Sequence, residues 1–153
     1  MPKKVRPVPK GFTALTPHLF VNDAHAALAF YKKAFGAKVL DKMLAPDKTL
    51  LHADVMVGDA HLFVSEPMMG NPPGSNSIHL YVENAEKAWK KAVAAGAEIV
   101  IPMHDAFWGD RYGVLKDPFG QQWAISSHVE DVTPVEMKKR MKVAFSKPPP
   151  QQQ

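Results

Sequence analysis

The sequence contains no cysteine, which excludes disulfide bonds and metal sites that depend on thiolates. No apolar run approaches the ~20 residues that a membrane-spanning helix needs. Residues 1–12 are basic and rich in proline without a long apolar stretch behind them, so we expect no signal peptide. These absences favour a reducing compartment, and we predict a cytoplasmic location.

The formal net charge of +4 is concentrated near the two ends of the chain. The basic residues are Lys3, Lys4, Arg6 and Lys10 at one end and Lys138, Lys139, Arg140 and Lys142 at the other. No helix-turn-helix, zinc-finger or aromatic RNA-binding motif accompanies this charge. We therefore interpret both ends as solvated segments and predict neither a nucleic-acid nor a membrane partner. A C-terminal interaction module built on the second basic cluster stays open as an alternative.

A repeat with an offset of 61 residues organises the chain, as the separation of His18 from His79 shows. The segment His18–Ala24 matches His79–Ala85 at four of seven positions, and Phe20 corresponds to Tyr81. After a one-residue gap the match resumes through Gly36 and Gly96. Two copies are too few for a solenoid, so the sequence predicts a duplicated module that packs against itself.

Each copy predicts one strand, one helix and three further strands. Alternating apolar residues indicate the strands, and Asp23, Asn84 and the two glycines are typical of helix ends. The predicted elements of the first copy are a strand at 14–21, a helix at 24–35 and strands at 37–44, 50–57 and 60–66. Those of the second are a strand at 76–82, a helix at 85–95 and strands at 97–101, 111–116 and 121–127. The predicted fold class is α+β, with two tandem β-α-β-β-β modules.

The predicted domain organisation follows from this repeat. A basic N-terminal arm covers residues 1–11, and a single domain covers residues 12–132. Within that domain, module one spans about 12–67, a linker rich in Pro and Gly spans 68–75, and module two spans about 76–132. A C-terminal helix is predicted within residues 133–147 from the capping box of Thr133 and Glu136, and residues 148–153 form a disordered tail.

Alternation along the strands separates an apolar face from a mixed face. The mixed face combines aromatic side chains with His, Ser, Asp and Gln, a composition typical of a ligand-binding surface and unusual for a sheet turned to water. Its expected members include His18, Phe20, His52, Phe63, His79, Tyr81 and Tyr112. We refer to the hollow that these residues are expected to line, between the two modules, as the trough.

The loop from Phe107 to Arg111 adds two adjacent aromatic residues and a cation. Trp108 is suited to stack on a ligand, and Arg111 to hold an anion with two hydrogen bonds. An equally weighted alternative is a structural loop in which Asp110 pairs with Arg111 and Trp108 covers the sheet edge.

Together the tandem modules, the segment Trp108–Gly113 and the turn Asp117–Gly120 resemble the vicinal oxygen chelate superfamily, which includes glyoxalases, bleomycin-resistance proteins and extradiol dioxygenases. The resemblance covers roughly residues 12–132 and is strongest to the PhnB-like branch of small bacterial proteins. It implies curved mixed sheets, a homodimer and, in the enzymes, a divalent metal. The family's ligand positions match Thr16, Phe63, Ser77 and Ala124, which lack strong donors, so we expect no metal cofactor.

The leading functional prediction is a protein that binds an aromatic or amphipathic small molecule, either sequestering a drug or metabolite or acting as a metal-independent enzyme. The predicted ligand-binding residues are His18, Phe20, His52, Phe63, His79, Tyr81, Phe107, Trp108, Arg111 and Tyr112. No catalytic residue is assigned, and enzyme activity stays open. The alternative is a metal-dependent lyase or dioxygenase whose relocated site uses His18, His52, His61, His79 and Asp54.

Overall fold

The structure, a computed structural model, describes residues 10–13, 16–67, 73–74 and 76–146. The first two residues of the strand predicted at 14–21 lie outside the described residues, as do nearly all of the predicted arm at 1–11, most of the linker at 68–75 and the whole tail at 148–153. No helix in the described ranges is long and apolar enough to span a bilayer.

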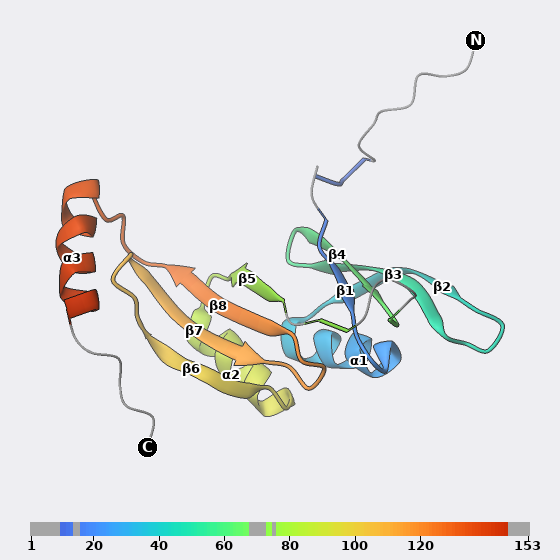
Figure 1. The fold of residues 1–153 in the computed structure, drawn as a ribbon. Coiled ribbons are helices and arrows are strands. Elements are labelled where there is room, and N and C mark those ends of the chain that lie inside the picture. The colour runs from blue at the N-terminus through green and yellow to red at the C-terminus, as the bar shows by residue number, and fades with distance from the viewer. Residues whose placement is uncertain (1–9, 14–15, 68–72, 75, 147–153) are drawn as a thin grey trace, which may run out of the picture.

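Two mixed four-stranded sheets form the body of the chain (Figure 1). Module one contains β1 (His18–Phe20), α1 (Ala24–Phe35), β2 (Lys38–Leu44), β3 (Leu50–Val57) and β4 (Ala60–Ser65). Module two contains β5 (Ser77–Tyr81), α2 (Ala85–Ala95), β6 (Glu98–Asp105), β7 (Asp110–Lys116) and β8 (Gln122–His128), and α3 (Pro134–Ser146) follows. The strand orders β1-β4-β3-β2 and β5-β8-β7-β6 are equivalent, which confirms the predicted fold class.

Both repeat helices have the predicted bounds because their end residues satisfy free backbone groups. Asp23 accepts a hydrogen bond from the N–H of Ala26, and Asn84 accepts one from Lys87. Gly36 and Gly96 end the helices at φ angles of 66° and 116°, a region that favours glycine.

The last strand of each module also holds the start of its helix. The N–H of Ala24 donates to Oε1 of Glu66 at 2.7 Å, and the N–H of Ala85 donates to Oγ of Ser127 at 2.8 Å. Glu66 and Ser127 occupy equivalent positions of the repeat. These contacts fix each helix against its own sheet.

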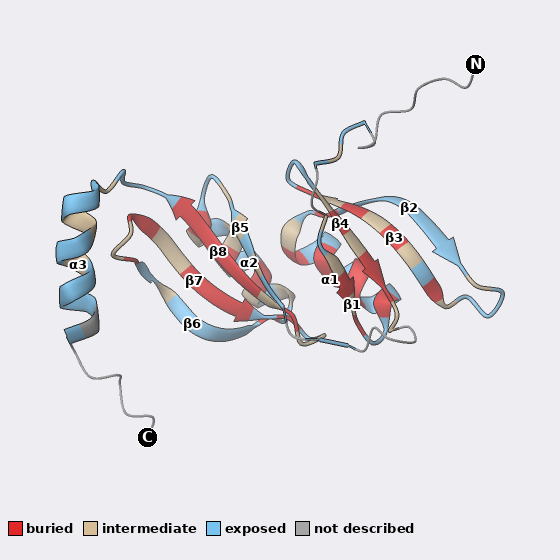
Figure 2. Cartoon of the chain, turned by 45° about the horizontal axis from the view of Figure 1, so that its top comes forward, coloured by how far each residue is buried: buried red, intermediate tan, exposed pale blue. Residues whose placement is uncertain are grey.

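Both helices cover the same side of the sheets, so the buried residues concentrate between them and the strands (Figures 1 and 2). Leu19, Val55 and Val64 are buried in module one, and Trp123 and Ile125 are buried in module two. No helix of the described residues covers the opposite side of either sheet, and we call this side the open face.

The two modules are joined through α1 and the turn that precedes β8. The hydroxyl of Tyr31 on α1 donates to Oδ2 of Asp117 at 2.7 Å, and the indole N–H of Trp123 donates to the same oxygen at 3.0 Å. Phe35 packs on Trp123 with ring centroids 4.3 Å apart. The predicted turn Asp117–Gly120 therefore also fastens module two to module one.

Two element boundaries differ clearly from the predictions. The described part of the first strand covers only residues 18–20, and β6 continues to Asp105 instead of ending at 101. The β6 extension pairs His104 with Tyr112 and Asp105 with Arg111 after two register shifts. Such shifts break simple alternation, which explains why the pattern alone underestimates β6. Helix α3 stands beyond the far end of the second sheet (Figure 1).

Candidate functional site

The strand registers place the predicted mixed-face residues on the two open faces. In module one, His18 is opposite Phe63, which is opposite Asp54. In module two, His79, Ala124 and Val114 form one such row, and Tyr81, Ser126 and Tyr112 form the next. Residues opposite one another on paired strands point to the same side of the sheet, so the predicted face assignment is confirmed.

Each module carries the same hydrogen bond between a histidine and a buried serine. Nε2 of His18 lies 2.8 Å from Oγ of Ser65, and Nε2 of His79 lies 2.9 Å from Oγ of Ser126. Both serines are fully buried. These bonds orient the two imidazoles in the same way relative to their sheets.

An aromatic ring stacks on each of these histidines. His18 and Phe20 have ring centroids 4.3 Å apart, and His79 and Tyr81 have centroids 4.6 Å apart. Both stacks are nearly parallel, at 25° and 24°. The repeat therefore presents two matched histidine–aromatic pairs on the open faces.

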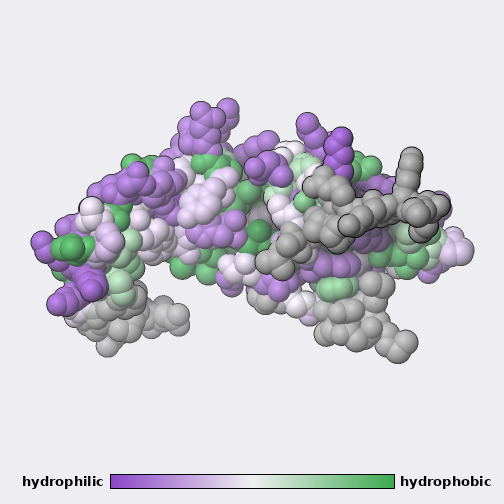
Figure 3. Space-filling model, turned by 90° about the horizontal axis from the view of Figure 1, so that it is seen from above, coloured by the Kyte–Doolittle hydropathy of each residue, from purple (hydrophilic) through white to green (hydrophobic). Residues whose placement is uncertain are grey.

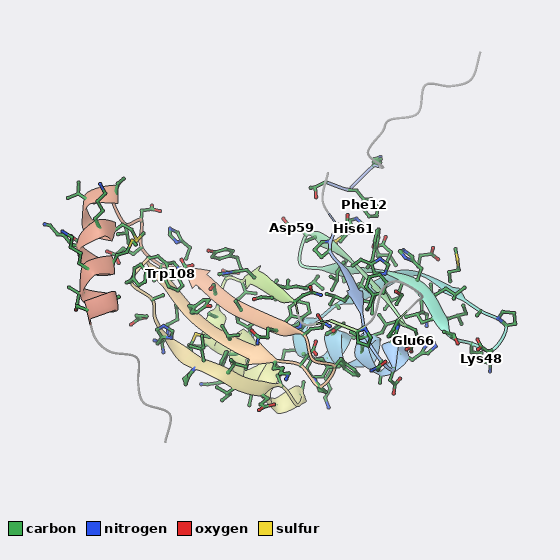
Figure 4. The ribbon with its side chains drawn as sticks, viewed as in Figure 1. Phe12, Lys48, Asp59, His61, Glu66 and Trp108 are labelled. Carbon is green, nitrogen blue, oxygen red and sulfur yellow. The ribbon has the colours of Figure 1, made fainter. Side chains whose placement is uncertain are left out.

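Further predicted residues extend each pair into a cluster. In module one, His52 lies 4.5 Å from Phe63 and 5.7 Å from His18 between ring centroids. In module two, Tyr112 contacts His79 and Trp108, and Trp108 contacts Phe107. We call these sets the first cluster (His18, Phe20, His52, Phe63) and the second cluster (His79, Tyr81, Phe107, Trp108, Tyr112). Figure 4 labels Trp108, at the end of the second sheet nearest α3.

A buried carboxylate, Asp110, anchors the outer end of the second cluster. Its Oδ2 accepts hydrogen bonds from the Tyr81 hydroxyl and the Trp108 indole, both at 2.9 Å, and its Oδ1 pairs with Nδ1 of His128 at 2.8 Å. Burial opposes ionisation of Asp110, but the bonds from His128, Tyr81 and Trp108 outweigh it and lower the Asp110 pKa. Asp110 is therefore an ionised acceptor that fixes two rings of the cluster.

The histidines differ in their electrostatic surroundings. Burial, together with the neighbouring His52, lowers the pKa of His18. Hydrogen bonds to Asp131 and Asp110 raise the pKa of His128, at the end of β8. A neutral His18 can accept a hydrogen bond or a proton from a ligand, as a general base does.

Arg111 lies on the helix side of the second sheet and not on the open face where it was predicted. It is opposite Ser127 and Asp105 in the register, and its guanidinium bonds Glu86 on α2 at 2.7 Å and Asp105 at 3.3 Å. Arg111 thus faces the helix side, and Asp110 does not brace it. Adjacent residues of one strand point to opposite sides, so Arg111 cannot share the face of Tyr112.

A cavity of about 430 Å³ lies where β1 and β5 approach each other, lined by Pro17–Leu19 and Asn76–His79. Val21 bonds Ser65, and Val82 bonds Ser126, so alternate residues of β1 and β5 pair with their own sheets. The main-chain groups of His18 and His79 therefore point toward this seam. Seen from above, hydrophilic and hydrophobic residues are interspersed over the surface (Figure 3).

The chemistry of the donors does not fit the metal of the superfamily's enzymes. Thr16, Phe63, Ser77 and Ala124 offer at most neutral hydroxyls. Within the described ranges no three His, Asp or Glu side chains gather as a metal-binding group. His18 and His79 each pair with a serine, and Nδ1 of His61 pairs with Asp54. The function proposed below therefore assigns no role to a metal.

Several residues that shape the site were not assigned to it from sequence. Ser65 and Ser126 could have been recognised, since each lies 47 residues after its histidine in both copies. The roles of Asp110 and His128 could not be recognised in this way. Their mutual bond and the bond from Tyr81 join different strands, and the sequence alone does not give the pairing of those strands.

Comparison with known proteins agrees with this architecture. The chain is 35% identical to the uncharacterized protein Mb0911c of Mycobacterium bovis over 141 residues, covering 84% of this chain and 91% of that one. It is 24% identical to protein YjdN of Escherichia coli, covering 73% and 93% of the two chains.

Solved structures show the same fold. TioX from Micromonospora sp. ML1 matches with a TM-score of 0.67 at 24% identity, covering 76% of this chain and 99% of that one. A PhnB protein from Bacillus cereus matches with a TM-score of 0.62 at 17% identity, covering 75% and 99%. The sequence profile described as Glyoxalase/Bleomycin resistance protein/Dioxygenase superfamily matches residues 12–125. The chain belongs to this superfamily, as its repeat and motifs predict.

Proposed function

We propose that the protein binds an aromatic or amphipathic small molecule in the trough between its two clusters. The observation that carries the proposal is the repeated histidine–aromatic stack, with His18 on Phe20 and His79 on Tyr81. Aromatic walls with a few fixed polar groups are the usual composition of small-molecule sites. The cavity at the seam separates the two stacks, so a flat ligand can contact both histidines there.

The polar groups define which ligand chemistry fits. Each cluster offers an imidazole held by a serine, and no Lys or Arg is among the residues of either cluster or of the cavity. The Asp110 carboxylate lies behind Tyr81 and Trp108, where it adds negative charge. This balance favours a neutral or cationic aromatic ligand over an anion. Drug or metabolite sequestration needs only this binding, and His18 is the group suited to proton transfer if turnover occurs.

We also propose that two copies of the chain associate. The two outer strands, β2 and β6, expose large apolar side chains, which monomeric proteins seldom leave open as a contiguous patch. They are Val39, Leu40, Met43, Leu44, Ile99, Val100 and Ile101. A second copy would cover these strands and enclose the open faces. Sedimentation of the purified chain tests this, with a sedimenting mass of twice 16.9 kDa expected.

The binding proposal is tested with 8-anilinonaphthalene-1-sulfonate and its cationic counterpart, a dimethylaminonaphthalene carrying a trimethylammonium group, both fluorescent aromatic probes. We expect saturable binding with preference for the cation. Phe20→Ala and Tyr81→Ala should each weaken binding about tenfold, whereas Val135→Ala on the exposed face of α3 should not. Equal binding by the variants and the parent would contradict the proposal.

The relocated metal site is tested on the same preparations. Metal analysis after exposure to zinc, nickel, manganese or iron is expected to show no stoichiometric ion that His18→Ala/His79→Ala removes. A stoichiometric ion lost in that double variant would establish the alternative and overturn the metal-independent reading.

A further inference from the structure

A second cavity, of about 320 Å³, lies at the junction of the modules and reaches His79 of the second cluster at one side. It lies between the β3–β4 hairpin and strands β5 and β8, and Gly11 and Thr13 of the N-terminal segment border it. Its volume is at the lower end of the range for small-molecule pockets, roughly 300–1,000 Å³. We call it the junction pocket.

The walls of the junction pocket are mostly apolar. They comprise Val57, Ala60, Leu62, Ile78, Leu80 and Trp123. Leu62 and Trp123 belong to the buried core, so part of the wall is rigid. A ligand here would gain its free energy chiefly from removing apolar surface from water.

The polar lining offers neutral groups and one carboxylate. Its side chains are those of Thr13, Asp59, His61 and His79, and no Lys or Arg is among the lining residues in the described part of the chain. Figure 4 places Asp59 on the side of His61 that is nearer to module two. An anionic ligand would meet the Asp59 carboxylate without a compensating charge.

Asp54 determines what His61 can offer. Nδ1 of His61 lies 2.8 Å from Oδ1 of Asp54, and the two side chains are 10% and 16% exposed. An ionised carboxylate only accepts, so Nδ1 carries the hydrogen in this bond. In the neutral ring Nε2 is then an acceptor, and none of the hydrogen bonds between described residues engages it.

Phe12 packs on the face of the His61 ring. The Phe12 and His61 centroids are 3.7 Å apart and the rings are nearly parallel, at 19° (Figure 4). His61 is thus fixed by Asp54 at its edge and by Phe12 on its face. Its Nε2, which accepts no hydrogen bond from the described residues, has a defined position beside an apolar cavity.

We propose that the junction pocket is a second ligand site, for a compact apolar molecule that donates one N–H or O–H hydrogen bond to Nε2 of His61. This site adjoins the trough at His79 but takes its hydrogen-bond acceptor from His61, which belongs to neither cluster. Its ligand differs in class because the acceptor Nε2 demands a donor, and Asp59 at the rim disfavours an acid.

The experiment uses indole, which has an N–H donor, and 1-methylindole, which has the same body without it. Each probe is titrated at pH 8 into the full chain with labelled methyl groups, and chemical shifts of Leu62, Ile78 and Leu80 are followed. We expect saturable shifts at these methyls and at least tenfold weaker binding of 1-methylindole.

Three variants locate the site. His61→Phe should abolish the preference for indole while both probes still bind, because the ring remains and the acceptor is lost. Ala60→Phe, at an exposed residue of the pocket wall, should weaken both probes even if His61→Phe fails to fold. Val135→Ala, on the exposed face of α3, should leave both affinities unchanged.

Equal affinity of the parent chain for the two probes would overturn the donor requirement. Absence of saturable shifts at the methyl groups of Leu62, Ile78 and Leu80 would overturn the site itself. Failure of these tests leaves the trough proposal standing, because binding in the trough is measured with the naphthalene probes and with Phe20→Ala and Tyr81→Ala.

Discussion

The two modules share a scaffold but differ in how they fix the aromatic ring that stacks on the histidine. Phe20 in module one has no hydroxyl and is held by packing alone. Tyr81 in module two has the same place and donates its hydroxyl to Asp110. The duplicated positions that hold helix to sheet, Glu66 and Ser127, keep the same role. The repeat thus preserves the contacts that hold each helix on its sheet. It varies the aromatic residue on the open face, which a ligand would contact.

The helix layers differ in a compensating way. Leu28 of α1 and Trp89 of α2 occupy equivalent positions, and the larger residue in module two lies over a glycine. A Cβ at Gly113 would come within 2.6 Å of the Trp89 ring, whereas the equivalent residue in module one is Ala53. In module two a larger helix residue, Trp89, is paired with a smaller strand residue, Gly113. The spacing between helix and sheet can therefore be similar in the two modules.

The largest expected effect is a difference in the free energy of unfolding between substitutions in the β-turns of the two modules. Asp117→Ala should lower the free energy of unfolding by about 3 kcal/mol, because it leaves the buried donors of Tyr31 and Trp123 without an acceptor. Asp59→Ala, in the equivalent but exposed hairpin of module one, should change it by less than about 0.5 kcal/mol. Chemical denaturation measures both. Equal losses would show that Asp117 is not the fastening described above.

The second prediction concerns the packing of Trp89 on Gly113. Gly113→Ala should destabilise the protein by about 2 kcal/mol through overpacking. Trp89→Leu/Gly113→Ala recreates the pair of module one, Leu28 with Ala53, and should cost less than the sum of its single changes. A double-mutant cycle by denaturation measures this coupling. Strict additivity would contradict the compensation.

The third prediction tests the anchoring of Tyr81. Tyr81→Phe makes module two resemble module one at this position and removes one hydrogen bond to Asp110, so stability should fall by about 1 kcal/mol. Phe20→Tyr provides the matched control and should bring no gain, since Leu50 occupies the position of module one that is equivalent to Asp110 and has no acceptor in its side chain. A gain from Phe20→Tyr would show an acceptor there after all.

The smallest effect is a difference in pH dependence. The pKa of His18 is lowered, so its folded state binds fewer protons and its contribution to stability falls as pH drops below about 6.5. The pKa of His128 is raised, so its contribution is present below about 6.5 and is lost as pH rises through the raised value. The imidazole resonances followed by NMR should give a pKa below 6.5 for His18 and above 6.5 for His128. The reverse order of the two pKa values would refute both assignments.

Much of the fold was predictable because its determinants are local. Asp23, Asn84, Gly36 and Gly96 act on neighbouring backbone groups, so both helix bounds could be predicted from them. Alternation likewise identified the open-face residues from Phe63 to Ser126. Register shifts in β6 made its length unpredictable, because a bulge interrupts the two-residue period.

The faces on which the predicted residues lie could be deduced from sequence, but their hydrogen bonds could not, and ligand binding by these residues stays a prediction. The predicted residues other than Arg111 lie on the open faces or in the loop that joins β6 to β7. The Arg111 prediction was wrong because its charge was weighed before its place in the strand, where Tyr112 already takes the open face. Asp110 and Asp117 could not be assigned their roles, since their partners lie on other elements.

The bond between Tyr31 and Asp117 joins side chains 86 positions apart along the chain, one from each half. Neither half alone can form it. The ultraviolet absorption or ring resonances of Tyr31 therefore provide a natural reporter of docking between halves, distinct from any signal of secondary structure within one half.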